Sequence, residues 1–323
     1  MSVIIKVWYI QHTEDLEMAH ITDRFYNARW GVFNHYLGGR MSTGEDWNAC
    51  VDSFDCEKLA ATLHKMGAGY YFITLMQGRK YMCAPNETFD RIAGTKPGEA
   101  CSKRDLVADL YDALSVYGID LYLYYTGDGP YIDREIGARF GFVEPRRNIT
   151  ETFVKNWAAV LEEYALRYGD KVKGWWIDGC YSDMFGYTDA LLQHYYDAVK
   201  RGNPEAIVSF NNGDAVREDV LDGRREPSLV KASSLEDFTS GEFQDFIYLP
   251  KQAFVDSSRS HMLIPLGIAS NGGWCARGCK RDHAYIKDFV NHVHAAGGVV
   301  TIDIFVDLQG NLDDEQVNTL MGI

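Results

Sequence analysis

Short apolar segments alternate with longer amphipathic segments along the whole chain. Residues 69–76, 119–126 and 172–177 are rich in β-branched and aromatic side chains and are predicted to form buried strands. Between them, residues 55–67 and 102–118 carry apolar residues at helical spacing, each with a polar residue that can cap the first turn and a glycine at the end. The alternation of strand and helix predicts an α/β fold.

The same alternation continues in both directions along the chain. Further strands are expected at residues 29–36, 206–210, 229–235, 262–267 and 299–304. Further helices are expected at residues 150–169, 187–202, 214–221 and 282–297, and from Asp313 onwards, and an ambiguous segment near residues 240–255 stands between the sixth and seventh strands. Eight strand–helix units with right-handed crossovers predict a (β/α)8 TIM barrel that forms a single domain over residues 1–323. A strand-like extension at residues 2–10 either plugs the floor of the barrel or joins a neighbouring subunit.

Composition and charge exclude several classes of function. The chain is 46% hydrophobic, which is enough for a globular core, and its net charge of −14 without a basic cluster argues against nucleic acid and anionic membranes as partners. No apolar run reaches the ~18 residues that a membrane span needs. The start of the chain does not read as a signal peptide, and seven scattered cysteines fit reduced thiols, so we expect a cytoplasmic protein. The oligomeric state stays open, a homo-oligomer included.

Polar and aromatic residues gather where the predicted strands end. In a barrel these ends meet at one mouth, where the active site lies. Carboxylates, amides and aromatic rings together are typical of a sugar-binding site, because hydroxyl groups need polar partners and the C–H face of a sugar stacks on an aromatic ring. We therefore expect a carbohydrate substrate to contact Asn34, His35, Tyr36, Gln77, Asp128, Trp176, Tyr181, Asn211, Asn212 and Trp274.

Two carboxylates flanking a glycosidic bond can carry out its hydrolysis. Asp178 directly follows the predicted strand that contains Trp175 and Trp176, so it is the candidate nucleophile, although an aspartate at this position could equally cap the following loop. Glu236 immediately follows the predicted strand at 229–235 and should face the mouth. Glu242 lies six residues further on, on a loop that could fold back, and the choice of acid/base between the two stays open.

The sequence does not point to a cofactor or a metal ion. Cys275, Cys279 and His283 are spaced four residues apart, but a clear fourth ligand is lacking. No GxGxxG segment follows the first strand, no GxxxxGK[ST] segment occurs, and no GxSxG segment marks a catalytic serine.

Four segments resemble the α-L-fucosidases of glycoside hydrolase family 29. Residues 27–36 (NARWGVFNHY) are similar to the first strand of the family. Residues 102–109 with 121–126 resemble its second helix and third strand, and residues 298–312 its last strand and the loop that follows. Tyr168-Gly169 with Trp175-Trp-Ile-Asp-Gly179 resembles YG…LWFDG, whose aspartate is the nucleophile of a retaining mechanism. The resemblance implies an exo-acting retaining glycosidase, with Asp178 as nucleophile.

Two departures from the family bear on the substrate. The family carries KHHDGF after its second strand, with histidines that help to hold fucose, whereas residues 76–81 here read MQGRKY and only His35 of that sugar-binding set is present. The last-strand NIGP is also absent, and we expect no C-terminal β-sandwich domain after the barrel. The sugar can therefore differ from fucose. The alternative hypothesis is a barrel of the same family that binds carbohydrate without catalysis.

Overall fold

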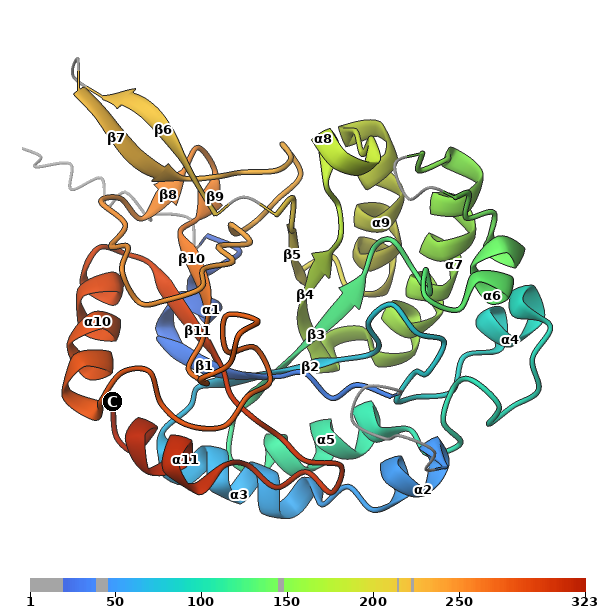
Figure 1. Cartoon of the computed structure of the whole chain (residues 1–323), viewed down its shortest axis with the longest axis horizontal. Coiled ribbons are helices and arrows are strands. Elements are labelled where there is room, and N and C mark those ends of the chain that lie inside the picture. Colours follow the sequence, from blue (N-terminus) through green and yellow to red (C-terminus); the bar gives the residue numbers. More distant parts are fainter. Residues whose placement is uncertain (1–19, 39–45, 145–147, 214, 222–223) are drawn as a thin grey trace, which may run out of the picture.

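Seven strands of the described residues form one parallel sheet at the centre of the molecule, in the order β10-β11-β1-β2-β3-β4-β5 (Figure 1). The structure is a computed structural model that describes residues 20–38, 46–144, 148–213, 215–221 and 224–323. The strands of the sheet are β1 (Trp30–Asn34), β2 (Tyr70–Thr74), β3 (Asp120–Thr126), β4 (Val172–Asp178), β5 (Ile207–Phe210), β10 (His261–Pro265) and β11 (Val299–Asp303). The α/β class is confirmed, and the central sheet has the parallel pairing expected of a barrel.

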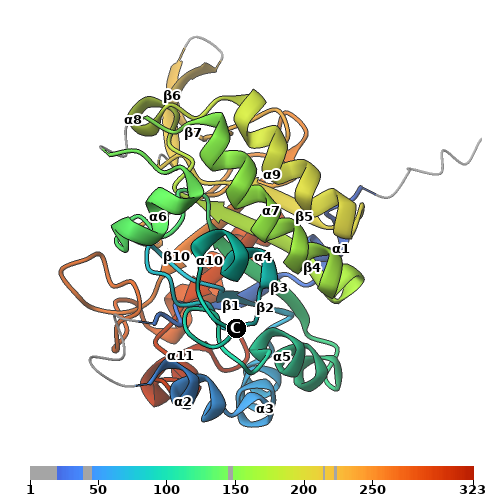
Figure 2. The same ribbon diagram turned by 90° about the vertical axis from the view of Figure 1, so that its right-hand side faces the viewer.

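Most helices lie on the outer side of this sheet (Figures 1 and 2). The helices of the described residues are α1 (Asp23–Asn27), α2 (Trp47–Asp52), α3 (Cys56–Met66), α4 (Glu87–Ala93), α5 (Leu106–Ser115), α6 (Arg134–Phe140), α7 (Glu151–Tyr168), the 3-10 turn η1 (Gly169–Lys171), α8 (Ser182–Phe185), α9 (Asp189–Gly202), α10 (His283–Ala295) and α11 (Asp314–Leu320). Asp55 caps α3 as expected, by accepting from Lys58 N. Helix α5 begins later than the helix expected at residues 102–118, because Asp105 rather than Ser102 caps it.

The period-two alternation of the strands separates two hydrophobic layers. Inward-facing rings and aliphatic side chains of the strands form one cluster with Phe25 and Phe238. The strand members of this inner cluster are Phe33, Tyr70, Phe72, Tyr122, Tyr124, Trp176, Ile207, Leu263 and Val299. Trp175 belongs instead to the outer layer that packs against the helices, so the two neighbouring tryptophans face opposite sides of the strand.

Helix α1 supplies the plug at the amino-terminal end of the sheet. The Phe25 ring is 1% exposed, and its centroid lies 4.7 Å from the Tyr70 ring and 5.2 Å from the Tyr122 ring. Arg259 holds α1 in place by donating to the Thr22 hydroxyl and to the Asp23 carboxylate at 2.7 and 2.8 Å. The strand-like segment at residues 2–10 lies outside the described residues.

Two expected elements between residues 214 and 235 are wrong. The expected helix at 214–221 is strand β6 (Val216–Leu221), and the expected sheet strand at 229–235 does not form, because β7 (Arg224–Leu229) pairs antiparallel with β6 and ends there. This hairpin projects from the body of the molecule (Figure 1). Asp222-Gly223 separates the two strands in the sequence, and this dipeptide favours two-residue hairpins.

Residues 237–243 lie between β5 and β10 and are bonded to both. Asp237 N donates to Val208 O at 2.8 Å, Phe243 N donates to Leu263 O at 2.9 Å, and Leu263 N donates to Gly241 O at 2.8 Å. Glu242 forms an isolated parallel bridge with Leu263 of β10, and Phe238 forms one with Arg259, two residues before β10 begins. This segment therefore takes the place of the sixth strand expected at residues 229–235, although it is shifted along the chain. A second short hairpin follows it, β8 (Phe254–Val255) with β9 (Ser258–Arg259).

All seven cysteines are free, and five of them are buried. Within the described part of the chain, none of the helices is both long and apolar enough to cross a bilayer.

Candidate active site

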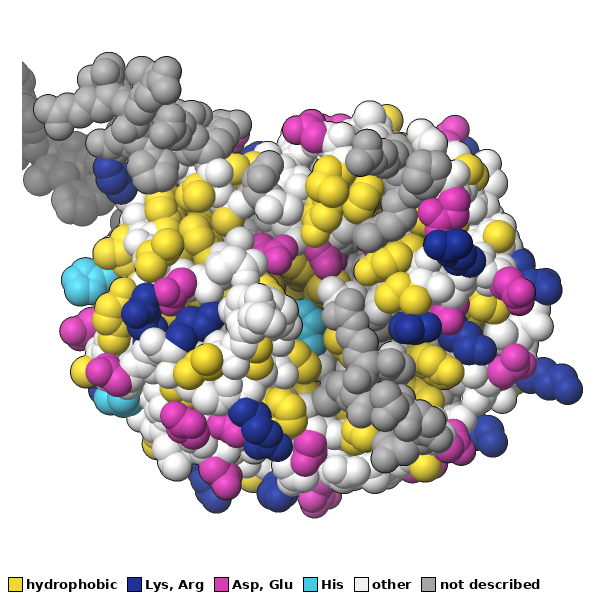
Figure 3. Space-filling view, viewed as in Figure 1, with side chains coloured by type: hydrophobic (Ala, Val, Ile, Leu, Met, Phe, Trp, Pro, Cys, Tyr) yellow, Lys and Arg dark blue, Asp and Glu magenta, His cyan; other side chains and the backbone are white. Residues whose placement is uncertain are grey.

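A pocket of about 730 Å³ opens at the carboxyl-terminal ends of the strands. In the space-filling view, acidic side chains and a histidine surround a hollow near the middle of this face (Figure 3). The pocket is lined by His35, Leu37, Gln77, Tyr124, Trp176, Asp178, Glu242, Leu263, Asn271, Trp274, Cys275, Phe305, Asp307, Leu308 and Gln309. Strands, the segment that carries Glu242 and two long loops therefore contribute to one cavity.

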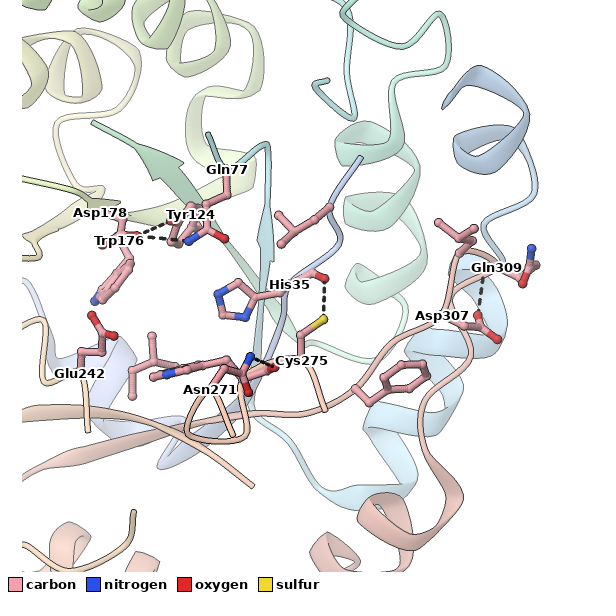
Figure 4. A pocket seen from close by; sticks show the side chains of 15 residues that line it. His35, Gln77, Tyr124, Trp176, Asp178, Glu242, Asn271, Cys275, Asp307 and Gln309 are labelled. Carbon is pink, nitrogen blue, oxygen red and sulfur yellow. Dashed lines mark hydrogen bonds between the residues drawn. The ribbon is translucent and has the colours of Figure 1, made fainter. Parts of the chain in front are cut away.

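Asp178 is the last residue of β4, and its carboxylate points into this pocket (Figure 4). It shares a strand face with Trp176 because residues two apart in a strand point the same way. Three side chains donate to it: Asn211 Nδ2 to Oδ1 at 2.8 Å, Gln77 Nε2 to Oδ2 at 3.5 Å, and the Tyr124 hydroxyl to Oδ2. The carboxylate is thus held in one orientation by donors from three different strands or strand ends.

Glu242 faces Asp178 across the side-chain amide of Asn211. Asn211 Nδ2 donates to both carboxyl groups, to Asp178 Oδ1 and to Glu242 Oε2. An amide nitrogen carries two protons about 120° apart, so two oxygens that each lie about 2.9 Å from it are about 5 Å from one another. One buried amide therefore sets the spacing of the two carboxyl groups.

The surroundings of the two carboxyl groups favour a proton on Glu242. Burial and the neighbouring Asp178 carboxylate raise the pKa of Glu242 to about 7, and the hydrogen bond from Asn211 opposes that rise. Burial and the same carboxylate raise the pKa of Tyr124 well above its ordinary value, so its hydroxyl stays protonated and remains a donor to Asp178.

Aromatic rings and one histidine form the rest of this end of the pocket. The Tyr124 and Trp176 rings are stacked with centroids 5.4 Å apart, and the Trp274 ring meets the His35 ring edge-on at 5.6 Å. Asp303, which is fully buried, accepts from His35 Nδ1 at 2.8 Å and also from Cys275 N at 2.8 Å. With Nδ1 committed to Asp303, the free nitrogen of the His35 ring is Nε2.

Comparison with protein families decides where the chain belongs. The sequence profile described as Alpha-L-fucosidase matches residues 6–323. The chain belongs to the α-L-fucosidase family. A search of curated protein sequences gave no match.

Solved structures show the same fold in other members of this family and in a second family. An endo-fucoidan hydrolase of glycoside hydrolase family 107 superposes with a TM-score of 0.68 at 16% identity, over 92% of this chain and 91% of that chain. A family 29 α-L-fucosidase from Bacteroides thetaiotaomicron superposes with a TM-score of 0.62 at 15% identity, over 93% of this chain and 72% of that chain. At such identities the likeness concerns the fold.

In this α-L-fucosidase family member, one predicted carboxylate does not reach the pocket. Glu236 is 3% exposed and is not among the lining residues. Its Oε1 accepts from Phe210 N and the Ser209 hydroxyl at 3.2 and 3.3 Å, and its Oε2 accepts from the backbone nitrogens of Ala232 and Ser233. The expectation that Glu236 faces the mouth is therefore wrong, since its oxygens tie residues 232–236 to β5.

Strand alternation also sorts the predicted sugar contacts. His35 faces the pocket, whereas its neighbours Asn34 and Tyr36 face the outer layer. There Asn34 Nδ2 donates to Ile304 O and the Tyr36 hydroxyl to Leu308 O. Asn211 reaches the two carboxyl groups, while Asn212 is not among the lining residues.

Asp128 and Tyr181 also lie outside the pocket lining. The Tyr181 ring stacks on Phe185 at 5.0 Å. Asp128 is 1% exposed and packs against Gly179, which has a φ of 70° and where a Cβ would lie 2.6 Å from Asp128 Oδ1. The glycine after Asp178 is therefore required by Asp128 and by the backbone conformation. Gln77, Trp176 and Trp274 do line the pocket as expected.

Several residues that line the pocket were not predicted from the sequence. Tyr124 could have been found from the period-two alternation of β3, because it lies two residues after the inward-facing Tyr122. Cys275, Phe305, Leu308 and Gln309 lie on loops without any periodic signal. Across the described ranges no group of three His, Cys, Asp or Glu side chains is placed to hold a metal ion, and Cys279 and His283 instead bond to the hydroxyl and carbonyl oxygens of Thr319.

Proposed function

We infer that this chain is a retaining glycoside hydrolase that acts on α-L-fucosides or on a closely similar sugar. The observation that carries the proposal is the shared donation of Asn211 Nδ2 to Asp178 and Glu242. A separation of about 5 Å between two carboxyl groups is the one that retaining glycosidases use (~5–5.5 Å), whereas inverting enzymes need ~6.5–9.5 Å to admit a water molecule. Membership of the α-L-fucosidase family supports the same class of reaction.

In the first step Asp178 attacks the anomeric carbon of the sugar. The bond from that carbon to the leaving oxygen breaks as the covalent glycosyl–aspartate bond forms, and Glu242 gives its proton to the leaving oxygen. A pKa of about 7 suits this role, because the acid is then protonated near neutral pH and still strong enough to release its proton.

In the second step water attacks the same carbon from the side that the leaving group vacated. Glu242, now ionised, takes a proton from this water, and Asp178 leaves as a carboxylate. The donors Tyr124 and Asn211 hold the Asp178 oxygens in place as charge leaves and returns to them.

The remaining groups at this end fit a sugar ring. Trp274 and the Tyr124–Trp176 stack offer apolar faces for C–H groups, and His35 Nε2 can pair with a hydroxyl. The proposal includes a closed (β/α)8 barrel, in which residues 237–243 complete the sheet between β5 and β10. The backbone hydrogen bonds of Asp237, Gly241 and Phe243 support that closure.

The test is turnover of aryl glycosides followed by chemical rescue. We expect the protein to hydrolyse 4-nitrophenyl α-L-fucopyranoside or another member of a panel of 4-nitrophenyl glycosides, with proton NMR showing retention in the first-formed product. Asp178→Gly and Glu242→Gly should each lose at least about 1,000-fold in kcat. Azide should restore activity to both, giving a glycosyl azide of inverted configuration with Asp178→Gly and of retained configuration with Glu242→Gly.

A matched control keeps these results specific. Asp112→Gly removes an exposed carboxylate on α5, outside the pocket, and should leave kcat unchanged. Full activity in Asp178→Gly, or an inverted first product, would contradict the mechanism. If the native protein binds the sugar but does not hydrolyse any glycoside, the chain is a carbohydrate-binding barrel and not an enzyme.

A further inference from the structure

The pocket is larger than one sugar ring requires. A pyranose with its substituents has about twelve heavy atoms, and at the ~30 Å³ that a water molecule occupies in the liquid it takes at most about 360 Å³. The cavity of about 730 Å³ therefore has room for about two rings. The lining residues show on which side of the first sugar ring this extra space lies.

The two ends of the pocket differ in chemistry. Asp178 and Glu242 lie at one end and Gln309 at the other, with His35 and Cys275 between them (Figure 4). A ring whose anomeric carbon lies between the two carboxyl groups therefore extends toward His35. The space beyond His35 adjoins the non-reducing side of that ring, since the leaving group departs from the carboxylate end.

Phe305 lines the pocket two residues before Asp307 and offers a fixed aromatic face there. The Arg277 guanidinium carbon lies 3.9 Å from the centroid of the Phe305 ring, and Arg277 is itself paired with Asp313 at 2.8 Å. The backbone nitrogen of Phe305 donates to the buried Gln316 amide oxygen at 2.8 Å. The ring is thus oriented before any ligand arrives, which lowers the entropy lost when a sugar stacks on it.

The loop that follows Phe305 is also fixed from within. Asp307 Oδ1 accepts from Gln309 N at 3.0 Å and from Asn311 N at 2.8 Å, so this carboxylate stabilises the turn. Asp55 N donates to Gln309 O at 2.9 Å, which ties the loop to the start of α3. These bonds involve the Gln309 backbone, and its exposed side chain stands at the rim of the pocket.

We propose that Phe305, Leu308 and Gln309 form a subsite for a second sugar ring, linked to the non-reducing side of the ring whose glycosidic bond is cleaved. The Phe305 ring stacks on the C–H face of this second sugar and the Gln309 amide binds its hydroxyl groups. The enzyme then cleaves inside an oligosaccharide chain, in place of the exo-action expected from the family resemblance. This proposal rests on the proposed glycosidase function.

The test compares substrates of two lengths. The probes are 4-nitrophenyl α-L-fucopyranoside and the 4-nitrophenyl glycoside of an α-L-fucosyl-fucose disaccharide. We expect kcat/KM to be at least tenfold higher for the disaccharide. In Phe305→Ala and in Gln309→Ala the ratio of the two kcat/KM values should fall toward one. Tyr117→Ala removes a partly exposed aromatic ring that does not line the pocket, and it should leave both kcat/KM values unchanged.

The outcomes separate this proposal from the function on which it rests. Equal kcat/KM values for both substrates, or a ratio that Phe305→Ala does not lower, would overturn the second subsite while leaving the hydrolase in place. If neither substrate is cleaved, calorimetry with free fucose and the free disaccharide decides. Tighter binding of the disaccharide that Phe305→Ala abolishes supports the subsite in a non-catalytic barrel, and no binding of either sugar overturns both proposals.

Discussion

Asp303 and His35 form a buried pair in which the carboxylate accepts from the imidazole Nδ1 at 2.8 Å. The second oxygen of Asp303 accepts from Cys275 N, also at 2.8 Å. Cys275 adopts a left-handed φ of 57°, which is uncommon for a residue other than glycine, so this hydrogen bond helps to hold a strained turn. One carboxylate therefore positions both the histidine and the loop that carries Trp274.

Replacing Asp303 by Asn should disturb both contacts at once. An amide offers one acceptor and one NH2 group, so either His35 Nδ1 or Cys275 N then faces a donor. We expect kcat/KM for an aryl glycoside to fall by about 100-fold, the loss that a misplaced contact group can cause. Nitrogen NMR of the His35 ring reports its tautomer. Combining Asp303→Asn with His35→Gln should add little further loss, and full additivity would contradict a positioning role.

Most of the parallel sheet could be predicted because its strands are buried on both faces. Continuous apolar segments such as those of β2 and β3 give a signal that does not depend on the rest of the molecule. The long helices were equally clear, since polar residues cap them and apolar residues recur at helical spacing. The hairpin β6–β7 was missed because Val216–Leu221 reads VREDVL, a mixed pattern that fits a helix as well as a strand.

The site was harder to predict because tertiary contacts assemble it. Asp178 could be found from its position at the end of a rigid strand. The choice between Glu236 and Glu242 depended on where the sixth strand runs, and residues 237–243 lack the apolar run that would have shown it. Phe305 and Gln309 enter the pocket from a loop whose shape is set by Asp307, which a linear pattern does not show.

The pH dependence of activity should report the proton on Glu242. Because burial and Asp178 raise the pKa of Glu242 to about 7, the protonated acid is present below that pH and is lost above it. We expect kcat/KM to fall as pH rises through about 7. With an aryl leaving group of low pKa, which needs little protonation, Glu242→Gln should lose this limb of the profile. An unchanged limb in Glu242→Gln would assign it to another group.

Stability should distinguish the two glutamates. The raised pKa of Glu242 means that the folded state binds a proton more tightly than the unfolded state, whose value is near 4.5, so stability falls as pH rises from about 4.5 to 7. Glu242→Gln removes that penalty, and its amide can donate toward Asp178. We expect its free energy of unfolding at pH 8 to exceed that of the native protein by about 1–3 kcal/mol.

The matched variant Glu236→Gln should be less stable than Glu242→Gln, although burial raises the pKa of Glu236 as well, to about 8. Its NH2 group would face backbone N–H donors, either that of Phe210 or those of Ala232 and Ser233. Leaving such buried donors without an acceptor costs roughly 1–3 kcal/mol. Urea unfolding of the native protein, Glu242→Gln and Glu236→Gln at pH 8 measures both differences in the free energy of unfolding. Equal stability of the two variants would mean that Glu236 does not tie residues 232–236 to β5.

His261 should make the fold sensitive to acid. Its ring is buried. The Nδ1 atom donates to Thr239 O at 2.9 Å, and Nε2 accepts from the Thr301 hydroxyl at 2.7 Å. Burial lowers the pKa of His261 from 6.5 to about 4. Above pH 6.5 both the folded and the unfolded states hold the ring neutral. Between pH 6.5 and 4 the unfolded state binds the proton and the folded state does not, so stability falls as pH falls.

This linkage amounts to at most about 3 kcal/mol between pH 6.5 and 4. His261→Gln lacks the titrating ring, so it should be less stable than the native protein at pH 7 but should lose less stability on acidification. His64→Gln removes an exposed ring on α3 and should keep the native pH dependence. Urea unfolding of the three proteins at pH 7, 5.5 and 4.5 gives the three slopes. A native slope in His261→Gln would place the acid sensitivity on other groups.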